Sequence, residues 1–137
     1  MSNCAVMFID PVDLSALAQA AADAFAIPLE QIEIWDGRQF TAPVTDPVIA
    51  QVAASSIEGV SAEFDGFDVF AAHTGGLATL PVAVALATRV QARALIGPET
   101  AEDYRWTLVA TDGSHQHVMV DGELFDDGTL AIVNPEP

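Results

Sequence analysis

The sequence predicts an α+β fold in which a mostly antiparallel sheet of five to seven strands packs against three helices. Five Asp-Gly dipeptides punctuate the chain, and this pair readily adopts the positive φ that tight hairpin turns require. Three apolar segments follow an Asp or Thr with a proline close behind, the pattern of a helix N-terminus. The remaining apolar segments alternate or run unbroken over strand lengths. Turns of this kind favour antiparallel pairing.

A single domain spanning residues 1–137 accounts for the length, with 135–137 as a frayed tail. Hydrophobic residues make up 51% of the chain and charged residues 18%, which excludes a disordered protein, because disordered chains of high charge lack apolar surface. The chain is therefore long and apolar enough to bury one core.

In the first half, the apolar run 4–9 predicts a buried strand, and Asp13 predicts the cap of a helix that ends near Ala26. Alternation over 31–35 predicts a strand that folds back at Asp36-Gly37 onto 39–42. Asp46-Pro47 predicts a second, shorter helix that includes 48–57 and ends near Gly59.

In the second half, segments 60–64 and 67–73 flank Asp65-Gly66 and predict a hairpin, with one long bent strand as the alternative. Thr79 predicts the cap of a third helix that ends at Gly97-Pro98. Segments 104–109 and 115–120 predict a hairpin with a three-residue loop whose glycine, Gly113, is left-handed. This loop pairs Trp106 with Val118 and Tyr104 with Val120, and a last strand, 130–133, follows Asp127-Gly128.

The charge excludes one class of partner. The chain has 4 arginines, no lysine and 20 acidic residues, so its formal net charge is −16, and nucleic-acid binding is excluded because it needs clustered cations. A membrane span is not expected, because the uncharged stretch 69–88 is interrupted by His73, by Gly75-Gly76 and by Pro81. One cysteine, Cys4, and the lack of a signal peptide make the cytoplasm the expected location.

The residues that carry chemistry do not form a catalytic or metal-binding pattern, so we expect no cofactor, no metal and, on balance, no enzyme. His115 and His117 share one side of a strand, but only His73 remains as a third ligand, and no zinc-type spacing supports it. Asp126-Asp127-Gly128 lacks the other ligands of a calcium loop. Cys4 lies within an apolar strand, where a thiol is usually inert.

The leading hypothesis is an acidic, cytoplasmic protein-binding module that covers a cationic site on a basic protein partner, as inhibitors and immunity proteins of similar size and charge do. Solubility, a saline cytoplasm or lysine-poor coding would also explain the acidity. The expected partner-binding residues are aromatic and acidic: Trp35, Asp36, Glu63, Asp65, Asp68, Asp126 and Asp127.

The alternative hypothesis is a small-molecule-binding protein or enzyme with a pocket at the ends of strands. If the strands ending near Asp10 and His73 are parallel neighbours, both side chains lie at one edge of the sheet, the edge where α/β sheets place ligands. Gly75 and Gly76 then precede a helix N-terminus that favours an anion. A homo-oligomer formed through an exposed sheet edge or an apolar patch is a third hypothesis.

Overall fold

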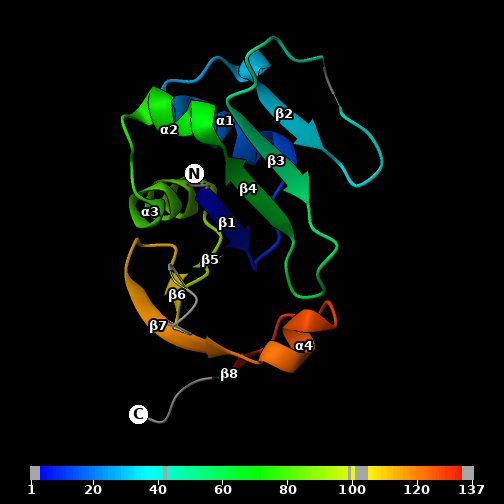
Figure 1. The fold of residues 1–137 in the computed structure, drawn as a ribbon, viewed down its shortest axis with the longest axis vertical. Helices are drawn as coiled ribbons and strands as arrows, with labels where there is room; N and C mark the ends of the chain where they lie inside the picture. The colour runs from blue at the N-terminus through cyan, green and yellow to red at the C-terminus, as the bar shows by residue number, and fades with distance from the viewer. Residues whose placement is uncertain (1–3, 42, 99, 101–104, 134–137) are drawn as a thin grey trace.

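A computed structural model describes residues 4–41, 43–98, 100 and 105–133 as one eight-stranded mixed sheet with four α-helices (Figure 1). The strand order is β2-β3-β4-β1-β5-β6-β7-β8. The strands are β1 (Cys4–Phe8), β2 (Ile32–Trp35), β3 (Ala50–Ala54), β4 (Ala62–Gly66), β5 (Ala94–Ile96), β6 (Trp106–Val109), β7 (His115–Val120) and β8 (Ile132–Val133). The helices are α1 (Leu14–Phe25), α2 (Asp68–Thr74), α3 (Thr79–Val90) and α4 (Gly122–Asp126), with a 3-10 turn at Leu29–Gln31.

The main core lies between the sheet and helices α1 and α3. Alternate residues of the strands point to this side, as period-two geometry requires, and Val6, Phe64 and Val52 form one continuous row across β1, β4 and β3. From the helices, Leu17 and Leu86 pack against the row and are fully buried. Burial of this apolar area is the dominant stabilising contribution to the fold.

A second, smaller core lies on the opposite face of the sheet, over β5, β6 and β7. Leu95 and Val118 are buried there, and the ring of Trp106 meets Phe125 of α4 edge-on, with centroids 5.2 Å apart. Asp121 caps α4 by accepting a hydrogen bond from the Leu124 N–H at 3.0 Å. The short helix therefore packs against this part of the face through Phe125, and in Figure 1 it lies beside the arrowhead of β7.

Several predictions from the sequence are confirmed. Helix α1 begins after Asp13, whose carboxylate accepts the Ala16 N–H at 3.0 Å, and it ends at a left-handed Ala26. The β6–β7 hairpin pairs Trp106 with Val118, and Gly113 has the positive φ expected of its loop. The predicted pairing of Tyr104 lies outside the described residues. The α+β class is also confirmed, although the sheet has more strands and helices than expected.

The predicted helix over 48–57 is wrong, because this segment forms strand β3. Its start is fixed by bonds to a distant part of the chain: the Thr45 and Ile49 N–H groups donate to the carbonyls of Glu30 and Gln31. β3 then runs parallel to β2, with Ile34 opposite Val52. Long-range pairing and β-branched residues outweigh the local helix signal at Asp46-Pro47.

The predicted strand over 67–73 is also wrong, because β4 ends at Gly66 and the chain enters α2. Gly66 is a strand residue and not the turn glycine of a hairpin. A Cβ built on it would lie 2.5 Å from the Phe70 ring, so the missing side chain lets α2 fold back over the end of β4. Helix α2 ends at Gly75, which has a φ of 71°.

Three boundaries in the rest of the chain also differ from expectation. Helix α3 starts at Thr79, with Ala78 rather than Thr79 as N-cap, and it ends at Val90, which leaves room for β5. Asp121-Gly122 starts α4 instead of forming a hairpin turn. The hairpin after Asp36-Gly37 is reduced to one bridge between Trp35 and Phe40, and Ala42 lies outside the described residues.

Within the described residues, no single helix has the length and apolarity needed to cross a membrane. The uncharged stretch 69–88 belongs to two helices, α2 and α3. Together they have the length and apolar composition of a membrane span, but they are bent by 84° at their junction.

Candidate functional site

An uncovered, acidic region lies on the face of the sheet opposite α1 and α3. We call it the acidic face, and it consists of the outward-pointing side chains of β2, β3 and β4: Glu33, Trp35, Gln51, Ala53, Glu63 and Asp65. The register arranges them in two rows, one running Glu33, Gln51, Asp65 and the other Trp35, Ala53, Glu63. Figure 1 shows these three strands in front of α1, while α4 covers only the other end of the sheet.

An open hollow of about 370 Å³ lies within the acidic face. Trp35 of β2, Glu63 and Asp65 of β4 and Gln51 and Ala53 of β3 line it. The hollow exists because Ala53, in the middle of its row, is much smaller than Trp35 and Glu63 on either side. It therefore has an aromatic wall on one side and two carboxylates on the other.

The carboxylates of this hollow have an unfavourable electrostatic environment. Burial raises the pKa of the Asp65 carboxyl, and the neighbouring charge of Glu63 raises it further. Glu33, at the rim, accepts a hydrogen bond from the Gln51 amide at 2.6 Å. Arg93 pairs with Asp10 at 2.8 Å, outside the hollow.

The aromatic side of the hollow is built by the loop that follows β2. The rings of Trp35 and Phe40 meet edge-on, with their centroids 4.9 Å apart, and the Phe40 side chain is 53% exposed. Asp36 holds the loop by accepting the backbone N–H groups of Gln39 and Arg38, and these bonds lower the pKa of the Asp36 carboxyl. A half-buried Trp35 and an exposed Phe40 beside carboxylates suit a cationic group, which is attracted by both ring faces and negative charge.

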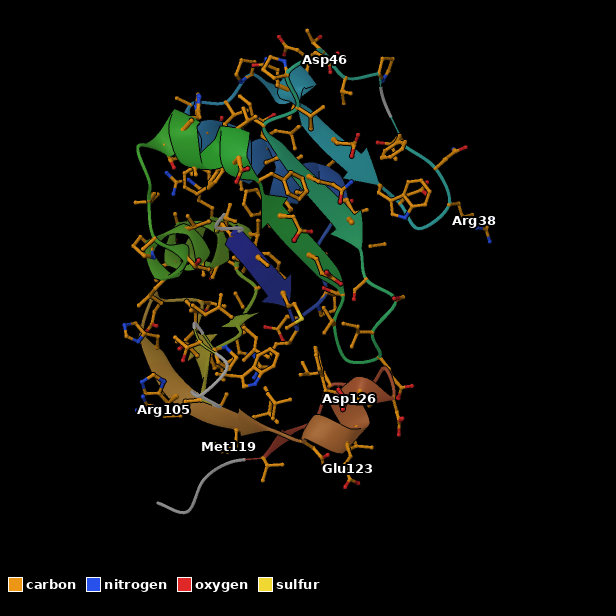
Figure 2. All side chains as sticks on the ribbon, in the orientation of Figure 1. Arg38, Asp46, Arg105, Met119, Glu123 and Asp126 are labelled. Atoms are coloured by element: carbon orange, nitrogen blue, oxygen red, sulfur yellow. The ribbon has the colours of Figure 1, made fainter. Side chains whose placement is uncertain are left out.

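The predicted partner-binding residues are only partly brought together. Trp35, Glu63 and Asp65 line one hollow, and Asp36 lies in the adjoining loop. Asp68 begins α2, beyond the end of β4. Asp126 and Asp127 lie at the end of α4, and Figure 2 shows Asp126 in the lower part of the molecule, apart from Arg38, which marks the loop after β2 in the upper part. The acidic groups thus form separate patches.

Asp10 and His73, the residues of the alternative pocket, lie beyond opposite ends of the paired strands β1 and β4. Strands β1 and β4 are antiparallel and pair Cys4 with Gly66, so α2, which follows Gly66, lies at the start of β1 and far from Asp10. The parallel arrangement on which this pocket depends is therefore wrong, because His73 belongs to a helix and not to a strand.

Each of these residues has a structural contact where it lies. The Asp10 carboxylate accepts from the Arg93 N–H and from its guanidinium, at distances down to 2.8 Å, and this pairing lowers the pKa of Asp10. The His73 Nε2 lies 2.9 Å from the carbonyl of Phe25, at the end of α1. Gly75 and Gly76 have positive φ and turn the chain from α2 toward α3.

A smaller pocket of about 150 Å³ is lined by Gly76 together with Cys4, Phe70 and Thr79. Burial raises the pKa of the Cys4 thiol, so the thiolate that nucleophilic chemistry needs is disfavoured. The described residues contain no group of three or more His, Cys, Asp or Glu side chains placed to hold a metal ion. His115 and His117 lie together on β7, away from His73 on α2.

Sequence reasoning missed two members of the acidic face, Gln51 and Ala53, because their segment was assigned to a helix. Glu33 was placed on a strand but not linked to the carboxylates of β4. The polar Gln51 between the apolar Ala50 and Val52 is the alternation in the sequence that could have indicated a strand here.

Comparisons with protein families, with curated proteins and with solved structures found no match to this chain.

Proposed function

We propose that the protein is a binding module for a basic protein partner. The partner docks on the acidic face, which covers a cationic site on the partner, as an inhibitor or immunity-type protein would. The observation that supports this proposal is the hollow, in which Trp35 and two closely spaced carboxylates, Glu63 and Asp65, surround an open space. The ion pair of Arg93 with Asp10 lies outside the hollow. A cation supplied by a partner would relieve their repulsion and stack on the ring of Trp35.

The net charge supports the same partner chemistry at longer range. At −16 the chain attracts basic proteins and speeds their association at low salt. The dispersed charge provides steering, whereas the hollow provides a place where one arginine or lysine side chain fits. The alternative function, a pocket shared by Asp10 and His73, has less support because these residues lie beyond opposite ends of the paired strands β1 and β4.

The first test is capture at low salt. The wild-type chain is immobilised on a resin and incubated at low salt with lysate from its own source. Bound proteins are eluted with rising salt and identified by mass spectrometry. The double variant Glu63→Gln/Asp65→Asn is used in parallel, with Asp126→Asn/Asp127→Asn as a control of equal charge change at the end of α4.

We expect a basic protein that binds the wild type and the control, but that binds the double variant at least tenfold more weakly when titrated in purified form. Equal losses in the two variants would show that only net charge matters, and a loss confined to the control would move the site to α4. A wild-type bait that retains no basic protein at low salt would contradict the proposal.

A further inference from the structure

The loop that follows β2 forms part of the rim of the hollow. Gly37 lines the hollow together with Trp35, and a Cβ built on Gly37 would lie 3.7 Å from the Cβ of Ala54, at the end of β3. The chain then turns back, because the Asp36 N–H donates to the Gln39 carbonyl at 3.1 Å. A partner seated in the hollow therefore lies next to the residues of this loop.

The hydrogen bonds of the loop hold its backbone in one conformation. The Asp36 carboxylate accepts the backbone N–H groups of Arg38 and Gln39 at 2.8 and 2.9 Å. Gly37, between them, has a φ of 100°, a conformation that suits glycine and that a side chain would make costly. A loop held in this way loses little conformational freedom when it meets a partner.

The loop presents the side chain of Arg38 to solvent. Arg38 is exposed, and Figure 2 shows its side chain pointing away from the rest of the molecule. The Asp36 carboxylate bonds to the backbone N–H of Arg38, and no residue in the described ranges forms a hydrogen bond or an ion pair with the guanidinium. Two other arginines differ, because Arg93 forms an ion pair and Arg89 donates to a carbonyl of its own helix.

An exposed aromatic ring follows two residues after Arg38. The Phe40 side chain is 53% exposed, and its inner edge is supported by the ring of Trp35. Aromatic residues and arginine are the residue types that are enriched in protein–protein interfaces and that contribute most to their affinity. The loop therefore extends the docking surface beyond the hollow, with one cationic and one apolar contact.

The two parts of this surface carry opposite charges. Glu63 and Asp65 line the hollow, whereas Arg38 places a positive charge on the loop at its rim. A guanidinium is planar, and it matches a carboxylate with two parallel hydrogen bonds. A partner with cations at both places would be attracted by the hollow but repelled by Arg38, so a uniformly basic surface fits poorly.

We propose that Arg38 binds a carboxylate of the basic partner, next to the cationic side chain that enters the hollow. This inference rests on the proposed function and adds that the docking segment of the partner carries charges of both signs. Two neighbouring contacts of opposite sign fix the orientation of the partner and select it over other basic proteins. The net charge attracts any polycation, and Arg38 discriminates among them at short range.

Two synthetic peptides test this contact. The first has the sequence Arg-Gly-Arg-Gly-Glu-Gly-Arg-Gly-Arg with blocked ends, and the second has glutamine in place of the glutamate. Their affinities for the wild type, Arg38→Gln and Arg89→Gln are measured by NMR titration of the full chain at about 150 mM NaCl. Arg89→Gln is the matched control, because it removes the same charge from an exposed position on α3, which packs on the other side of the sheet from the acidic face.

We expect Arg38→Gln to lower the affinity for the glutamate peptide about threefold, the scale of one exposed ion pair, without lowering the affinity for the glutamine peptide. Net charge alone predicts the opposite sign, because the variant is more acidic and should attract both peptides more strongly. Arg89→Gln should lower neither affinity. If Arg38→Gln does not lower the affinity for the glutamate peptide, or lowers both affinities equally, the inference is wrong while binding in the hollow stands.

The double variant Glu63→Gln/Asp65→Asn, titrated with the same peptides, separates this inference from the proposed function. It should bind both peptides more weakly than Asp126→Asn/Asp127→Asn, which has the same net charge. If the two double variants bind both peptides equally, or if the wild type binds neither peptide at about 5 mM, the proposed function fails and this inference fails with it.

Discussion

At the scale of single residues, the repulsion between Asp65 and Glu63 is an electrostatic cost within the candidate site. Asp65 is half-buried, and its pKa is raised first by burial and then by the charge of Glu63. The folded state therefore binds the proton more tightly than the unfolded state does, and ionisation of Asp65 opposes folding. Binding sites often contain a charged group that lowers the stability of the free protein, because the ligand neutralises that charge when it binds.

The stability of an Asp65→Asn variant tests this cost. At pH 7 we expect the free energy of unfolding to increase by about 0.5 kcal/mol, the scale of a like-charge pair on a protein surface. The sign follows from linkage, because the pKa of Asp65 is higher in the folded state than the value of 3.8 in the unfolded chain. In the wild type, the free energy of unfolding therefore falls as the pH rises from 3.8 through the folded pKa. The variant has no carboxyl at this position and lacks this part of the pH dependence.

Urea unfolding at several pH values measures both effects. Asp126→Asn is the control, because it removes one exposed carboxylate and reports what lower net charge does alone. If the Asp65 and Asp126 variants gain equally, the cost does not arise locally at the acidic face. A stable Asp65 variant would also show that a loss of partner binding is not caused by unfolding.

At the scale of elements, the sequence predicted those features that depend on local signals. Asp13 and Gly113 fix a cap and a turn within a few residues of themselves, and both predictions were correct. Segment 48–57 carries the local signal of a helix, but it is a strand because Ile49 bonds to Gln31, far away in the chain. The acidic face depends on this pairing, so only its β2 and β4 members could be identified from the sequence.

The short helix α4 is an element that the second core depends on. Phe125→Ala should lower the free energy of unfolding by about 2 kcal/mol, because it removes the ring that covers Trp106 and part of the buried area over β6 and β7. Leu124→Ala, on the same helix but 41% exposed, should cost less than about 0.5 kcal/mol. Chemical denaturation followed by circular dichroism compares the two, and equal losses would mean that α4 contributes little through Phe125.

At the scale of the whole molecule, the net charge opposes folding and association alike. With 20 acidic and 4 basic residues, the carboxylates repel one another in the compact state more than in the expanded chain. The structure places Glu63 and Asp65 close together on the acidic face, while Arg93 pairs with Asp10 outside it. A basic partner would lower this repulsion at the acidic face.

Salt should therefore stabilise the isolated chain. Raising NaCl from about 10 mM to about 150 mM shortens the Debye length from about 30 Å to about 8 Å, and we expect the Tm to rise by about 3–6 °C. Because screening saturates, most of the rise should occur below about 0.2 M, whereas an effect of salt on apolar hydration would continue to grow at molar concentrations. Calorimetry over this range distinguishes the two. A Tm that is flat below 0.2 M would mean that the carboxylates are too dispersed for their repulsion to matter, and the charge would then bear on partners rather than on folding.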